Sequence, residues 1–89
     1  MNKENERILR RYYQYLKLEK NFSENTIEAY ERDLDKFLHF LDDEGKDMLH
    51  PELSDFHTFA SIMHDIGISS TSLSRILSGL RSFYHFLVI

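Results

Sequence analysis

The chain has 89 residues, of which 42% are hydrophobic and 13% aromatic, and it contains no cysteine. This length predicts one domain with one core, and the absence of cysteine excludes a disulfide framework and a thiolate metal cage. The charged N-terminal stretch and the lack of a long apolar run argue against a signal peptide and a membrane span, so we expect a soluble, cytoplasmic protein.

Charge is distributed unevenly along the chain. Residues 1–20 carry six Lys and Arg against three acids, and residues 21–45 carry two against eight. Residues 46–68 carry one Lys against four acids, whereas residues 69–89 carry two arginines and no acid. The formal net charge of −4 argues against a nucleic-acid partner, which requires clustered Lys and Arg. The positions of the charges are therefore more informative than their sum.

The first two predicted elements are helices at residues 4–20 and 24–43. The first repeats apolar residues at the spacing of one helical face: Ile8, Leu9, Tyr12, Tyr13, Tyr15 and Leu16. Ser23 is a suitable N-cap for the second helix, and Gly45 suits the position just after its end. The inner face of the second helix is predicted to contain Ile27, Tyr30, Leu34, Phe37, Leu38 and Leu41.

Two further helices are predicted in the second half of the chain. Pro51 can occupy the first turn of a helix at 52–66, since a proline there costs no hydrogen bond. Its inner face is predicted to contain Leu53, Phe56, Phe59, Ala60 and Met63. Gly67 ends this helix, and Ser69 or Ser70 caps a fourth that reaches the C-terminus. Without any alternating strand pattern, the fold class is an all-α four-helix bundle with short connections.

The second helix separates its acids from its bases. Glu24, Glu28, Glu31 and Asp35 follow one flank, while a stripe nearly opposite the core holds Asn25, Ala29, Arg32 and Lys36. A helix stabilised only by internal ion pairs would tend to alternate the two signs along one face. The basic stripe is therefore a candidate for contact with an anion. Asn25 and Thr26 add polar groups at the N-terminal end of the helix, where the helix dipole already favours an anion.

The fourth helix has an unusual polar face. Opposite its apolar side lie Thr71, Ser74, Arg75, Ser78, Arg81, Ser82 and His85. Serine is a poorer helix former than Glu or Lys, so its repeated use indicates a close partner. Short hydroxyl side chains permit close approach to DNA and can bond phosphates, and Arg can bond a phosphate or a guanine edge. The alternative is that these serines pack against another helix or against another copy of the chain, as in a protein-interaction module that self-associates through this Ser-rich face.

Catalytic and metal-binding patterns are not found. His57 and His64 are too far apart along one helix to hold the same ion, and the other histidines are scattered. There is no Gly-rich phosphate loop, no Ser nucleophile motif and no paired-carboxylate site. We expect no metal, no cofactor and no catalysis within these residues.

Four stretches, taken in order, match the pattern of a known family. They are YYQYLKLEKNF, SENTIEAYERDLDKFLHFL, PELSDFHTFASIMHDIG and ISSTSLSRILSGLRSFYHFL. Together they cover nearly the whole chain, which resembles the N-terminal core-binding, SAM-like domain of tyrosine site-specific recombinases of the Xer and phage-integrase type.

The resemblance implies that residues 1–89 form half of a clamp around duplex DNA at a recombination site. The other half would be a C-terminal catalytic domain that breaks and rejoins DNA through a tyrosine, so this fragment would bind DNA without cutting it. The apolar ending FLVI is consistent with a polypeptide that continues. The family also assembles as a tetramer on DNA, and by analogy the first helix would contact neighbouring protomers.

The family lays its second and fourth helices against the major groove. The resemblance therefore assigns DNA contacts to the second helix and the residue before it: Lys20, Asn25, Thr26, Arg32 and Lys36. From the fourth helix it assigns Thr71, Ser74, Arg75, Ser78, Arg81 and Ser82. Since few phosphates would be neutralised by this acidic domain, its affinity for DNA should depend only weakly on salt.

Overall fold

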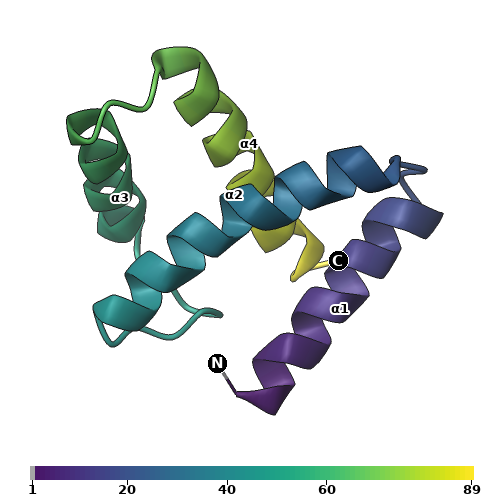
Figure 1. Cartoon of the computed structure of the whole chain (residues 1–89). Helices are drawn as coiled ribbons and strands as arrows, with labels where there is room; N and C mark the ends of the chain where they lie inside the picture. The colour runs from purple at the N-terminus through teal and green to yellow at the C-terminus, as the bar shows by residue number, and fades with distance from the viewer. Residues whose placement is uncertain (1) are drawn as a thin grey trace.

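A computed structural model of the chain describes residues 2–89 and contains four α-helices joined by short connections (Figure 1). The helices are α1 (Lys3–Leu18), α2 (Glu24–Asp43), α3 (Leu53–Asp65) and α4 (Ser70–Phe86). The predicted all-α bundle is confirmed. Over the described residues, no helix combines the length and the apolar character that crossing a membrane requires.

The helix ends follow the predicted capping residues. The Ser23 hydroxyl accepts a hydrogen bond from the Thr26 amide at 3.2 Å, and the Ser69 hydroxyl accepts one from the Ser72 amide at 3.2 Å. Gly45 has φ +68° and Gly67 has φ +95°, a conformation that L side chains rarely adopt. Each glycine follows the C-cap of a helix, so the predicted ends of α2 and α3 are confirmed.

The start of α3 differs from the prediction. The helix begins at Leu53 with Glu52 as its N-cap, so Pro51 precedes the helix and is not in its first turn. The reason is a capping box, in which Asp55 accepts the Glu52 amide at 2.8 Å. Leu53 was predicted to face the core but is 73% exposed, because it lies in the first turn of α3 at the edge of an open groove between α3 and α4.

The other helix limits differ by one or a few residues. α1 ends at Leu18 and not at residue 20, and Asn21 then adopts φ +56°, which reverses the chain before α2. α4 ends at Phe86, three residues before the end of the chain. These differences lie in the last turn, where helices commonly fray.

The core forms where α2 crosses α4, the most extensive helix contact in the fold. Phe37 of α2 stacks on Phe56 with ring centroids 4.8 Å apart and meets the edge of Phe59 at 5.1 Å. On the α1 side of the core, Phe83 of α4 packs against Tyr12 with ring centroids 5.1 Å apart. Figure 1 shows α2 crossing in front of α4, with the C-terminus beside α1. The crossing therefore sets which polar faces of α2 and α4 lie together.

The connection between α2 and α3 is fastened at two points. The Tyr84 hydroxyl of α4 donates to the Met48 carbonyl at 2.7 Å, and the Lys46 ammonium lies 3.0 Å from the Asp55 carboxylate. Burial raises the pKa of the Tyr84 hydroxyl, so it remains a hydrogen-bond donor across the physiological range. These contacts hold α3 against the bundle.

Candidate nucleic-acid interface

A groove of about 350 Å³ runs between α2 and α4. Four of the residues predicted to contact DNA line it: Asn25, Thr26, Arg75 and Ser78. Its remaining lining residues are Ala29, Tyr30, Asp33 and Gly79. Two helices far apart in the sequence thus contribute their predicted polar residues to one surface.

Arg75 is anchored at the floor of this groove by a residue of the opposite helix. Its Nε donates to Asp33 Oδ2 at 2.9 Å, and its Nη2 donates to Asp33 Oδ1 at 3.1 Å. The Asp33 side chain is only 4% exposed, whereas that of Arg75 is 55% exposed. The Lys36 ammonium lies 3.9 Å from Asp33 Oδ1. The groove therefore contains a buried carboxylate with two cations directed at it.

Asp33 was missed by sequence reasoning, which placed no acid among the residues assigned to the interface. A signal was present: Asp33 lies three residues after Tyr30 and four before Phe37, so it borders the apolar face of the helix. An acid at such a border becomes buried on packing and then requires a cation. Its partner, 42 residues away, was not identifiable from spacing along one helix.

The polar groups at the N-terminal end of α2 are partly hydrogen-bonded within the chain. The Thr26 hydroxyl lies 3.0 Å from the Ser23 hydroxyl, so it has an internal partner as well as an exposed surface. Asn25 is exposed at the mouth of the groove. Residues 2–89 contain no side-chain hydrogen-bond partner for Asn25, in contrast to Thr26 in the same turn.

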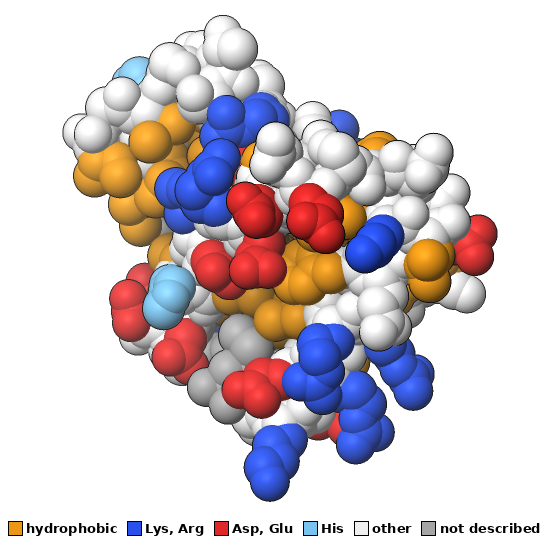
Figure 2. Space-filling model, turned by 45° about the vertical axis from the view of Figure 1, so that its right-hand side comes forward, with side chains coloured by type: hydrophobic (Ala, Val, Ile, Leu, Met, Phe, Trp, Pro, Cys, Tyr) orange, Lys and Arg blue, Asp and Glu red, His pale blue; other side chains and the backbone are white. Residues whose placement is uncertain are grey.

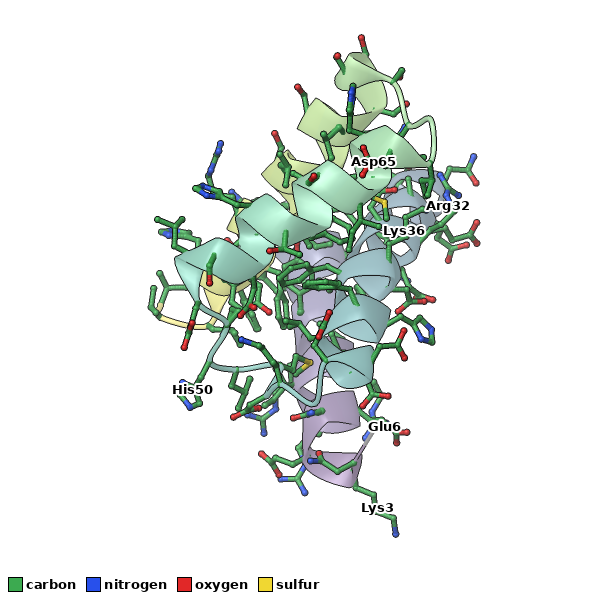
Figure 3. All side chains as sticks on the ribbon, turned by 90° about the vertical axis from the view of Figure 1, so that its left-hand side faces the viewer. Lys3, Glu6, Arg32, Lys36, His50 and Asp65 are labelled. Atoms are coloured by element: carbon green, nitrogen blue, oxygen red, sulfur yellow. The ribbon has the colours of Figure 1, made fainter. Side chains whose placement is uncertain are left out.

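The predicted cations of α2 lie together. Arg32 is exposed and Lys36 is half-buried, and in Figure 3 both extend toward the same end of the molecule, opposite the end that carries Lys3. Lys20 lies outside this group, with its ammonium 6.0 Å from the centre of the Tyr15 ring of α1. Lys36 is therefore linked to the groove through its contact with Asp33, whereas Arg32 is exposed on the same helix and Lys20 lies at the end of α1.

The polar face of α4 divides into three parts. Thr71, Ser74 and Ser78 are exposed. Ser82 is half-buried and accepts a hydrogen bond from the Tyr12 hydroxyl of α1 at 3.0 Å. Arg81 lines a second groove, on the α3 side, together with Phe56. The exposed hydroxyls are thus concentrated in the first half of α4, beside the groove.

Basic and acidic side chains form separate groups on the surface. Figure 2 shows a group of Asp and Glu near the centre of one face, groups of Lys and Arg above and below it, and further acids toward the edges. Burial raises the pKa of the Tyr13 hydroxyl, and the charges of Glu31 and Asp35 on the acidic flank of α2 raise it further. The predicted separation of the two signs therefore persists in three dimensions.

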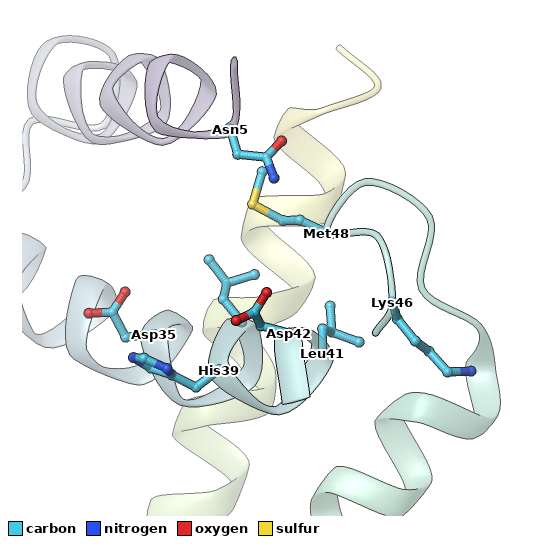
Figure 4. A pocket seen from close by; sticks show the side chains of 8 residues that line it. Asn5, Asp35, His39, Leu41, Asp42, Lys46 and Met48 are labelled. Carbon is cyan, nitrogen blue, oxygen red and sulfur yellow. The ribbon is translucent and has the colours of Figure 1, made fainter. Parts of the chain in front are cut away.

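A smaller cavity, of about 120 Å³, lies at the other end of α2 (Figure 4). Its polar lining consists of Asn5, Asp35, His39, Asp42 and Lys46, none of which was assigned to DNA. Within residues 2–89, no group of three or more His, Cys, Asp or Glu is arranged to hold a metal ion. The candidate interface is therefore the groove between α2 and α4 and the residues around it.

Comparison with known families identifies the class of domain. Residues 9–89 match the family model of the phage integrase N-terminal SAM-like domain. Since the match covers most of the chain, the chain belongs to this family.

Individual relatives are recombinases. The chain is 43% identical over 79 residues to the tyrosine recombinase XerC of Pediococcus pentosaceus, a match that covers 86% of the chain and 26% of the relative. It is 40% identical over 81 residues to XerC of Staphylococcus saprophyticus, covering 91% and 27% respectively. It is 33% identical over 79 residues to the tyrosine recombinase XerD of Oceanobacillus iheyensis, covering 86% and 27%.

The chain spans about a quarter of the length of the curated relatives it matches. No solved structure gives a significant match. The family assignment therefore depends on sequence similarity across the four helices.

Proposed function

We propose that this chain is the DNA-binding module of a tyrosine recombinase, with α2 and α4 laid against the major groove of duplex DNA. The observation that carries the proposal is the groove in which Asn25, Thr26, Arg75 and Ser78 lie together. The sequence predicted these residues separately, from the patterns of two different helices. The family membership supports the same function.

The chemistry of this surface suits a polyanion. Arg75 and Lys36 are two cations directed at the buried carboxylate of Asp33, and Arg32 is a further, exposed cation of α2. The exposed hydroxyls of Thr71, Ser74 and Ser78 are short enough to permit close approach and can bond phosphate oxygens. Arg and Asn are the side chains that bond guanine and adenine edges in the major groove.

The remaining parts of the proposal follow from the recombinase relatives. Residues 1–89 would form one core-binding domain, and DNA cleavage and rejoining would be performed by a separate catalytic domain of the parent protein. Its partners would be a duplex recombination site, that catalytic domain and other recombinase protomers. This division explains how a chain with no catalytic motif of its own would serve an enzyme.

The proposal is tested by fluorescence anisotropy with a labelled duplex at several salt concentrations. Arg32→Ala and Lys36→Ala each remove one cation that α2 is predicted to direct at DNA, whereas the control Arg10→Ala removes one from α1. Each interface variant should bind more weakly and lower the salt slope by about one, while the control should match the wild type. Equal affinity of all four proteins would contradict the proposal.

Sedimentation separates this function from self-association through the Ser-rich face. The DNA-binding module should remain a monomer as its concentration rises and should co-sediment with duplex DNA. A dimer that is insensitive to both salt and DNA would favour the protein-interaction alternative. The use of Ser82 by Tyr12 already removes one hydroxyl from that face.

A further inference from the structure

Asp33 lies in an unexpected place for an interface with DNA. Within residues 2–89 it is the one acid that lines the groove between α2 and α4, and its side chain is 4% exposed. A carboxylate in this position repels the phosphates of DNA and is costly to bury. Its contacts with Arg75 and Lys36 explain why the fold tolerates it, and they also limit what Arg75 can do.

The hydrogen bonds to Asp33 determine which edge of Arg75 faces outward. Asp33 occupies the edge formed by Nε and Nη2, with both distances close to 3 Å. The planar guanidinium has a second pair of donors, formed by Nη1 and the remaining Nη2 hydrogen, on its other edge. Arg75 lines the groove with its side chain 55% exposed, and residues 2–89 provide no hydrogen-bond partner for Nη1. Arg75 therefore keeps one complete bidentate donor pair for an outside partner.

Anchoring also reduces the entropy that Arg75 would lose on binding. A free arginine samples many rotamers and loses conformational entropy when it is fixed. With Nε and Nη2 already held by a buried residue of the neighbouring helix, much of that freedom is lost on folding. The guanidinium plane is then oriented before any ligand arrives, which favours a partner with two acceptors at fixed spacing.

We propose that Asp33 is a positioning residue that presents the outer edge of Arg75 to a pair of hydrogen-bond acceptors on duplex DNA. This inference rests on the proposed function and adds a specific role to a residue that does not itself face the ligand. The acceptor pair is either two phosphate oxygens or O6 and N7 of a guanine, since both match the guanidinium fork.

Replacement of Asp33 by Asn provides a test in which two effects have opposite signs. Asp33→Asn removes one negative charge, which by simple electrostatics should strengthen DNA binding. It also leaves one acceptor oxygen where the carboxylate had two, so the fork to Arg75 is broken. The matched control is Asp35→Asn, which removes the same charge from an exposed position two residues away on α2.

Affinity is measured by fluorescence anisotropy on a labelled duplex of random sequence, and circular dichroism verifies that each variant is folded at the assay temperature. We expect Asp33→Asn to bind about tenfold more weakly and Asp35→Asn to bind as well as the wild type or more tightly. If Asp33→Asn instead binds as tightly as Asp35→Asn, the inference is overturned. If the wild type binds no duplex, the proposed function fails and this inference fails with it.

Arg75→Lys keeps the test decisive if Asp33→Asn does not fold. Lysine retains the charge and can still pair with Asp33, but it lacks the bidentate fork. It should therefore weaken binding about as much as Asp33→Asn does, and the double variant should bind no more weakly than either single variant. Wild-type affinity of Arg75→Lys, or additive losses in the double variant, would contradict a role of Asp33 through Arg75.

The nature of the acceptor pair is resolved by comparing a duplex of only G·C pairs with one of only A·T pairs. Guanine readout predicts that the wild type prefers the G·C duplex and that Asp33→Asn abolishes this preference without changing the salt slope. Phosphate contact predicts equal losses on both duplexes and a salt slope lower by about one. Either result supports positioning by Asp33, whereas an unchanged affinity on both duplexes excludes it.

Discussion

Residues 2–89 contain two buried aspartates, and their surroundings differ. Asp33 is 3% exposed at the crossing of α2 and α4, and Asp55 is 5% exposed at the start of α3. Asp55 accepts the Glu52 amide at 2.8 Å and contacts Lys46 at 3.0 Å, so it fastens a helix end and a loop. Among the described residues, the polar partners of the Asp33 carboxylate are the side chains of Arg75 and Lys36, and Arg75, which it binds most closely, remains half exposed.

An ion pair with a buried carboxylate can therefore have two different consequences. A buried carboxylate whose partners are backbone and loop groups restricts the fold, since the connection between α2 and α3 cannot move without breaking it. A buried carboxylate whose partner is an exposed guanidinium orients that guanidinium toward solvent. We therefore expect substitutions near Asp55 to change stability alone, and substitutions near Asp33 to change both stability and DNA affinity.

The largest expected effect on stability is that of Asp55→Ala. The variant loses the reciprocal cap of α3 and leaves Lys46 without its partner, so its melting temperature should fall by about 10 °C. Thermal denaturation followed by circular dichroism measures this change. The control Asp65→Ala removes an exposed acid from the other end of α3 and should not lower the melting temperature. A DNA affinity that differs from wild type at a temperature where the variant is folded would break the comparison.

Arg75→Ala should have the next largest effect. It leaves Asp33 buried with only Lys36 nearby, so we expect a loss of about 1–2 kcal/mol in the free energy of unfolding, measured by urea denaturation. Arg32→Ala, a matched change at an exposed position of α2, should cost less than about 0.5 kcal/mol. Weaker DNA binding should accompany the loss of stability in Arg75→Ala. Full stability together with weaker binding would show that the contact with Asp33 contributes nothing to folding.

Tyr84→Phe tests the Asp55 region without changing its charge. The variant loses the hydrogen bond to the Met48 carbonyl, and we expect a loss of about 1 kcal/mol in the free energy of unfolding. Tyr15→Phe is the control, because residues 2–89 contain no hydrogen-bond partner for the Tyr15 hydroxyl. DNA binding should be unchanged in both variants. A change in affinity for Tyr84→Phe would extend the interface to the α3 side of α4.

The smallest expected effect is the pH dependence of the Asp55 contact. The hydrogen bond from the Glu52 amide, and then Lys46, lower the pKa of Asp55 below its ordinary value of 3.8, while Asp55 raises the pKa of Lys46 above 10.5. The stabilisation by Asp55 is therefore complete above pH 3.8 and is lost as the pH falls through the lower, folded-state pKa. The stabilisation by Lys46 is complete below pH 10.5 and is lost as the pH rises through the folded-state pKa of Lys46.

Urea denaturation of the wild type and of Asp55→Asn across pH measures this dependence. The difference in the free energy of unfolding between the two proteins should be constant near neutral pH and should shrink in acid. A difference that grows in acid would mean that the pKa of Asp55 is raised on folding, the opposite of the expected direction.

Most of the helical architecture could be predicted from the sequence. Ser23, Ser69, Gly45 and Gly67 mark helix ends through local hydrogen bonds and backbone conformation, so their effect does not depend on the rest of the chain. Pro51 was assigned wrongly, because the reciprocal bonds between Glu52 and Asp55 start α3 one position later than a proline rule suggests.

The candidate interface could be predicted only in part. Asn25, Thr26, Arg75 and Ser78 line one groove, and their assignment to DNA binding stays a prediction. Ser82 is half-buried against α1, which the pattern of α4 alone did not indicate. A helical pattern specifies which residues share a face, but it does not specify which neighbouring helix covers part of that face.

Local sequence patterns were enough to predict the four helices, most of their caps, most of their apolar faces and the separation of acidic from basic residues. Each of these features depends on contacts within a few positions of the chain. Only the tertiary structure decided that Asp33 lies under Arg75, that Ser82 faces Tyr12 and that Arg81 borders α3. Those outcomes depend on the angle at which α4 crosses α2, and that angle results from packing of the whole core around Phe37 and Phe83.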